Sequence, residues 1–193
     1  MKHVSYLVLF ILLPTVLFAQ KPLTPEATKV RDAYEWLLKQ SNLPENQLLF
    51  IRSFPDNKDA FIETFTPHTF DQLYFQRDVY LAKYHEFGKM YPKQVLAKSI
   101  EIGRKLHVAD GPAAEIQKSI MEIANSHPAA LVAEMKGLGK KERLALVTFI
   151  ADVKDHNSYP QYQQLIDKLV KIEATNIADM LIEARDVRMR QAQ

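Results

Sequence analysis

The chain has 193 residues, of which 47% are hydrophobic and 25% charged, and it contains no cysteine. This balance excludes collagen-like, low-complexity and disulfide-stapled proteins. The formal net charge is only +2, and basic and acidic residues are interspersed after residue 21, so we expect no nucleic-acid partner.

The N-terminal segment has the layout of an export signal, because it reads MKHVSYLVLFILLPTVLFAQ. A lysine and a histidine precede an apolar run that begins at Val4, and a small residue, Ala19, follows it. The run forms roughly 24 Å of helix, which is shorter than the ~30 Å hydrocarbon core of a membrane. We expect residues 1–19 to be a cleaved signal peptide, with Gln20 as the new N-terminus, and an uncleaved anchor is the alternative. Residues 20–193 are then one domain in the periplasm or outside the cell.

The mature domain is predicted to be all-α. The chain has only five glycines and no sustained alternation of apolar and polar residues, so strands and hairpins find little support. Without cysteines, a packed core has to stabilise an exported domain. A chain of this length buries roughly 70% of its unfolded surface, which is enough for that purpose.

Helix-start signals, which are capping residues or prolines at the first helical position, precede each apolar stripe. They predict helices that begin at Pro25 (capped by Thr24), Pro44, Pro92, Pro128, Lys140, Pro160 and Thr175 or Asn176. They also predict a short segment from Asp56, a helix after a Thr69–Gln72 capping box and a helix capped by Asp110. The helix from Lys140 is expected to reach Asp155 with Leu144 on its apolar stripe, and the last helix carries Val187 on its own stripe. We therefore expect nine or ten short antiparallel helices, as a globular bundle or a helical-repeat-like stack.

Two features of the middle of the chain concern packing. The pattern of residues 92–100 recurs without a gap at 112–120, with proline, lysine, serine and isoleucine at matching positions, and this echo favours the stack. Ser99 and Gly103 are small residues four apart within one apolar stripe. They predict that a neighbouring helix approaches closely there.

The large aromatic residues are concentrated in one part of the chain. Residues 50–91 hold seven of the ten phenylalanines and four of the eight tyrosines. Large side chains would let short helices build a core from few contacts. The alternative is that some of these rings line a groove for a peptide, a glycan or an apolar ligand.

Within this aromatic stretch lies the most informative polar group. Its candidate binding residues are Arg77, Tyr80, Tyr84, His85 and Glu86. The spacing places Arg77 beside the aromatic stripe, where its guanidinium either stacks on Tyr80 and pairs with a nearby acid, or binds a carboxylate or phosphate. A third interpretation makes Glu86 or Asp78 a general acid.

Other catalytic and metal-binding patterns fail on their spacing. There is no G-x-S-x-G motif and no thiol, and Gly137, Gly139 and Lys140 do not have the spacing of a phosphate-binding loop. Asp152 and His156 are four apart, but no second cluster completes a metal shell. We therefore expect no metal and no cofactor.

These observations favour a non-enzymatic exported protein that binds another macromolecule, with a protein as its partner. An inhibitor, an immunity protein or an envelope adaptor would fit this description. The first alternative is a hydrolase or lyase that acts on an envelope polymer through an acid near Glu86. The second is a small-ligand carrier with an aromatic pocket in residues 50–91. After signal cleavage we expect no stable membrane insertion.

Overall fold

The computed structural model describes residues 23–66, 73–106, 111–153 and 159–191. Within these ranges the chain forms α-helices, one short 3₁₀ helix and no β-strand, which confirms the predicted all-α class. The helices are α1 (Pro25–Lys39), α2 (Pro44–Ser53), α3 (Lys58–Phe65), η1 (Leu73–Gln76), α4 (Arg77–Met90), α5 (Pro92–Leu106), α6 (Pro112–Ser126), α7 (Pro128–Gly137), α8 (Lys140–Ala151), α9 (Tyr159–Lys171) and α10 (Thr175–Gln191). The expected signal peptide, its cleavage point between Ala19 and Gln20, the Thr69–Gln72 capping box and Asp110 lie outside the described residues.

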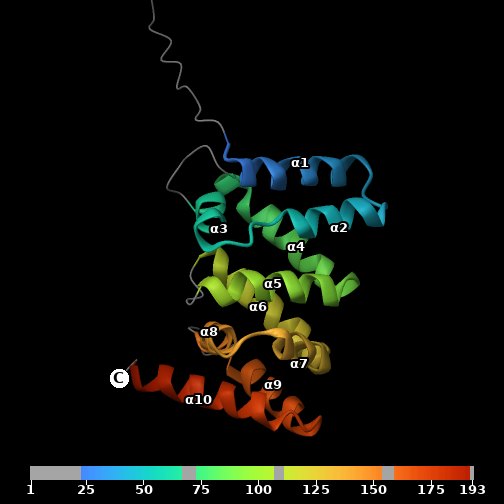
Figure 1. Ribbon diagram of the computed structural model, residues 1–193. Coiled ribbons are helices and arrows are strands. Elements are labelled where there is room, and N and C mark those ends of the chain that lie inside the picture. Colours follow the sequence, from blue (N-terminus) through green and yellow to red (C-terminus); the bar gives the residue numbers. More distant parts are fainter. Residues whose placement is uncertain (1–22, 67–72, 107–110, 154–158, 192–193) are drawn as a thin grey trace, which may run out of the picture.

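The helices are stacked in two rows, from α1 at one end to α10 at the other (Figure 1). In one row α1 packs on α2, α2 on α5, α5 on α8 and α8 on α10. In the second row α4 packs on α6 and α6 on α9, and contacts of α4 and α6 with α5 join the rows. The two segments that share a sequence pattern are α5 and α6, which pack against each other. None of the described helices is both long and apolar enough to cross a membrane.

Local capping explains where several helices begin. The hydroxyl of Thr24 accepts a hydrogen bond from the backbone N–H of Ala27 at 3.2 Å, as the sequence predicts for the first residues of α1. In α3 the side chain of Asn57 accepts from the N–H of Ala60 at 2.8 Å, so this helix begins at Lys58 rather than at Asp56.

A contact between helices supplies hydrogen-bond partners at the end of α8. This helix ends at Ala151, earlier than the predicted Asp155. The side-chain amide of Gln117, on α6, donates to the carbonyl oxygens of Phe149, Ile150 and Asp152 at 2.7, 3.3 and 3.1 Å. These carbonyls need partners at a helix end, and a residue far away in the sequence supplies them.

The aromatic residues of the N-terminal half form a packed core. Those that are buried together are Phe50, Phe54, Phe61, Phe65, Tyr80, Tyr84 and Phe87. Their rings are in direct contact; for example, the ring centroids of Phe54 and Tyr84 are 4.3 Å apart. Among the described residues, the aromatic cluster therefore fills the space between the helices.

The small residues of α5 allow the close approach that their spacing predicts. Ser99 is buried, and its hydroxyl lies 3.0 Å from that of Tyr84 on α4. A Cβ added to Gly103 would lie 2.8 Å from the ring of Phe149 on α8. Gly103 therefore leaves room for α8 to pack closely on α5.

Candidate functional site

The two tyrosines of the predicted polar group belong to the core. Tyr80 and Tyr84 are both buried, and burial raises the pKa of each phenol above its usual value. The hydroxyl of Tyr80 donates to the side-chain oxygen of Gln76 at 3.2 Å, and that of Tyr84 donates to the carbonyl oxygen of Val95 at 3.2 Å. Both phenols thus have partners within the protein.

The three charged or titratable members of the group point elsewhere. The guanidinium of Arg77 pairs with the adjacent Asp78 at 3.0 Å, and Glu86 pairs with Lys83 at 2.6 Å on an exposed part of α4. His85 turns toward α6, where its Nδ1 lies 3.0 Å from the hydroxyl of Ser119 and its Nε2 lies 2.8 Å from a carboxylate oxygen of Glu122. The structure therefore does not bring the five predicted residues together around one cavity.

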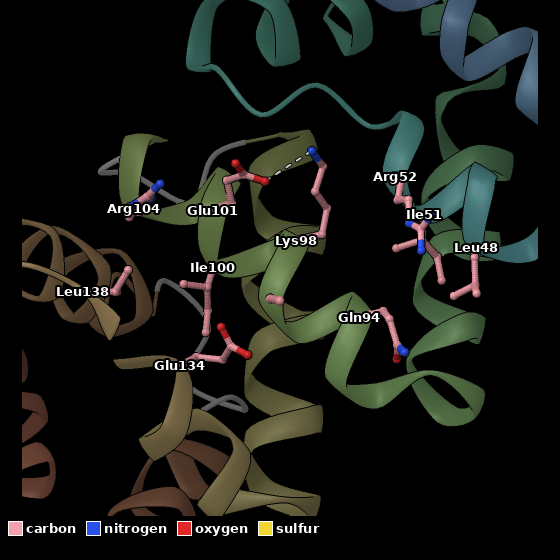
Figure 2. Close-up of a pocket in the computed structure, with 11 residues that line it drawn as sticks. Leu48, Ile51, Arg52, Gln94, Lys98, Ile100, Glu101, Arg104, Glu134 and Leu138 are labelled. Carbon is pink, nitrogen blue, oxygen red and sulfur yellow. Dashed lines mark hydrogen bonds and ion pairs between the residues drawn. The ribbon is translucent and has the colours of Figure 1, made fainter. Parts of the chain in front are cut away.

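A groove of about 400 Å³ lies between α2, α5 and α7 (Figure 2). Its wall carries Lys98, whose ammonium lies 3.3 Å from the carboxylate of Glu101, as the dashed line in Figure 2 marks. Arg104, on the same helix, forms an ion pair with Glu142 of α8. These charges are paired within the protein, whereas Arg52 and Glu134, which also line the groove, form no ion pair with another described residue. The unpaired charges of this groove are therefore one of each sign and give it no net preference.

A larger groove of about 800 Å³ lies between α8 and α10, at the C-terminal end of the stack. Leu144 of α8 is 60% exposed in its wall, and Val187 of α10 is 38% exposed opposite. Met180 and Ala184 add further apolar surface. The sequence places Leu144 and Val187 on apolar stripes expected to be buried, so their exposure corrects that expectation.

A third groove of about 440 Å³ adjoins the second one at Arg143. It is lined by α7, by the turn between α9 and α10, and by the first turn of α10. We call the two together the α10 trough, whose α10 side runs from Asn176 to Gln191. At 1.5 Å per residue this side is roughly 22 Å long.

The two sides of the α10 trough differ in charge. The α7–α8 side carries Lys136, Lys140 and Arg143 and no carboxylate. None of these three cations forms an ion pair with another described residue. The opposite side carries Glu173 and Glu183 together with Arg188, which pairs with Asp152 at 3.6 Å. The basic charge is therefore concentrated on one edge of the trough.

The sequence contained a partial signal for this site. Leu144 and Val187 are recognisable as apolar residues on amphipathic helices, but periodicity alone does not show which apolar positions a neighbouring helix covers. Neither residue is in the predicted polar group, and none of the five members of that group lines the α10 trough.

Comparison with known protein families, with curated proteins and with solved structures finds no match for this chain. Within the described residues, no three histidine, aspartate or glutamate side chains are grouped as metal ligands.

Proposed function

We propose that the chain is an exported helical protein that binds another protein through the α10 trough and catalyses no reaction. The observation that carries this proposal is the exposure of Leu144 within a concave surface. An exposed apolar side chain in a groove with a polar rim is typical of a binding site. The export-signal layout of residues 1–19 supports a partner in the periplasm or outside the cell.

The shape of the trough favours a macromolecule over a small ligand. A small-molecule site is a compact cleft that covers most of its ligand. The α10 trough instead extends for roughly 22 Å along one helix. A small molecule would occupy only part of this length, whereas a segment of another protein can contact all of it.

The structure gives less support to the two alternatives. A hydrolase or lyase would need an acid that faces a cleft, but Glu86 pairs with Lys83 and lines none of the grooves described above. A carrier would need an aromatic pocket, but the described rings of residues 50–91 pack against one another. None of the three grooves has an aromatic ring in its wall.

Site-specific photo-crosslinking in the native cell tests the proposal. A photoreactive amino acid replaces Leu144 in one variant and Leu38 in a control, because Leu38 is 65% exposed but lies on α1 at the opposite end of the stack. We expect irradiation to give one discrete protein adduct from position 144 and none of that size from position 38. The absence of an adduct at 144, or the same adducts from both positions, contradicts the proposal.

A further inference from the structure

We infer that the occupant of the α10 trough is an amphipathic α-helix of about four turns, with an acidic edge that faces α7 and α8. The inference depends on the proposed function and adds the secondary structure and the charge pattern of the partner. Three observations carry it: the spacing of the α10 side chains, the absence of a strand in the described ranges, and the one-sided distribution of charge.

The spacing of the α10 side chains fits a helix that lies alongside them. Apolar residues of the trough occur at Ile177, Met180, Ala184 and Val187, which are three or four positions apart and therefore share one face of α10. Met180 and Val187 are the more exposed members, and the buried Ile177 and Ala184 form the floor between the helices. Two helices pack by fitting such rows of side chains into each other's grooves. A partner helix as long as the whole α10 side of the trough, from Asn176 to Gln191, needs about four turns, with apolar residues at i, i+3, i+4 and i+7.

An extended peptide has less to bind here. A peptide that binds as a strand pairs its backbone with the free edge of a sheet. Across residues 23–66, 73–106, 111–153 and 159–191 the chain has no strand and hence no such edge. The walls of the trough are helices and the turn between α9 and α10, and the backbone N–H groups of that turn also bond within the chain, so recognition depends on side chains.

The charge distribution defines the polar edge of the partner. Lys136, Lys140 and Arg143 form a basic edge on the α7–α8 side, and no described carboxylate pairs with them. Carboxylates along one edge of the docked helix would complement these cations, which favours both the rate of association and the correct orientation. The opposite edge of the partner faces Glu173 and Glu183 and gains nothing from further acids.

Two other occupants fit these features less well. A membrane surface binds an amphipathic helix through a protruding apolar face, whereas Leu144 and Val187 lie in a groove. A symmetric dimer would bring the same surface of two copies together. Each copy would then present a concave trough to a concave trough, so neither copy would supply a ridge that fills the other.

Binding of defined peptides to the full chain tests the inference. Three fluorescent peptides of about 16 residues share one composition of apolar residues: the first has a helical apolar stripe and a glutamate edge, the second has lysines in place of the glutamates, and the third has glutamates but a scrambled stripe. We expect the first peptide to bind at least about tenfold more tightly than either of the others, measured by fluorescence anisotropy at fixed ionic strength.

A charge reversal within α8 provides a matched control. Arg143→Glu is expected to reduce the preference for the acidic peptide at least about tenfold and to improve binding of the basic one. Lys141→Glu places the same charge change on the same helix, at an exposed position outside both grooves, and should leave the preference unchanged. Circular dichroism of both variants verifies that they are folded.

The outcomes separate this inference from the proposed function. Equal binding of the acidic and basic peptides, or of the striped and scrambled peptides, overturns the inference even when Leu144 still crosslinks to a protein. Binding to anionic lipid vesicles without peptide selectivity overturns it in favour of a membrane surface. A dimer in sedimentation equilibrium that Arg143→Glu changes and Lys141→Glu does not would assign the trough to a second copy. Loss of the crosslink at 144 contradicts the proposed function itself.

Discussion

Replacing Gly103 by alanine tests the close approach of α5 to α8, the helix that carries one wall of the α10 trough. The added Cβ would lie 2.8 Å from two ring atoms of Phe149 and 3.2 Å from the terminal methyl of Ile120. Phe149 is fully buried, so its ring cannot move into solvent. The overlap is expected to cost about 1–3 kcal/mol, against a gain of about 1 kcal/mol because alanine favours a helix over glycine.

Gly137 offers a matched control within the same protein. It is the last residue of α7, and a Cβ added there meets no atom within 4 Å. Gly137→Ala should therefore be stabilising by about 1 kcal/mol, and Gly103→Ala, which gains the same helix preference but carries the overlap, should be less stable than it by about 1–3 kcal/mol.

Urea unfolding followed by circular dichroism at 25 °C measures the difference between these two variants, provided that both unfold in one transition with similar m values. If Gly103→Ala is as stable as Gly137→Ala, the α5–α8 interface relaxes easily and the close approach does not constrain the position of α8. If it is less stable and also binds the acidic striped peptide more weakly, the position of α8 matters for the trough as well.

Three further predictions follow from particular contacts. Burial raises the pKa of Tyr84 and Tyr162, so their contribution to the free energy of unfolding is complete below about pH 10 and is lost above it, at about 1.4 kcal/mol per pH unit for each phenol. Urea titrations from pH 8 to 11.5 should show this decline, and an equally steep decline in Tyr84→Phe would refute it. Leu181→Ala removes a fully buried side chain and should lower the free energy of unfolding by about 2–5 kcal/mol, whereas Leu144→Ala, at an exposed position, should lower it by less than about 0.5 kcal/mol. The same thermal or urea assay measures both variants, and equal losses would contradict the described burial. Gln117→Leu removes the donor that binds the last carbonyls of α8, so it should lower the free energy of unfolding by about 1–3 kcal/mol and speed amide hydrogen exchange in that turn. Unchanged exchange would show that this contact does not determine the helix end.

Much of the fold could be predicted because its signals are local. A hydroxyl or amide next to the first turn binds its free N–H groups, and proline at the first helical position needs no such partner, so the starts at Pro25, Pro44 and Pro92 can be read from neighbouring residues. The end of α8 could not be predicted in this way. The carbonyls at that end accept hydrogen bonds from Gln117, which is more than thirty residues away in the sequence.

The candidate site was less predictable, because a residue's chemistry does not indicate where its side chain points in the fold. The spacing of Tyr80, Tyr84 and His85 places them correctly on one helix, but two of them are in the core and the third contacts α6. Only the packing of neighbouring helices decides which members of an apolar stripe stay exposed. Leu144 and Val187 were therefore indistinguishable from core residues before the helices were arranged in space.

The sequence by itself determined that the domain is helical, where most helices begin, and that its N-terminal segment has the layout of an export signal. These properties depend on residues within a few positions of one another, which interact through short-range capping and the period of the helix. Only the tertiary structure decided that α8 and α10 leave a trough between them and that its free positive charges lie on one edge. That outcome depends on how far apart helices from distant parts of the chain are held, and local sequence does not specify such distances.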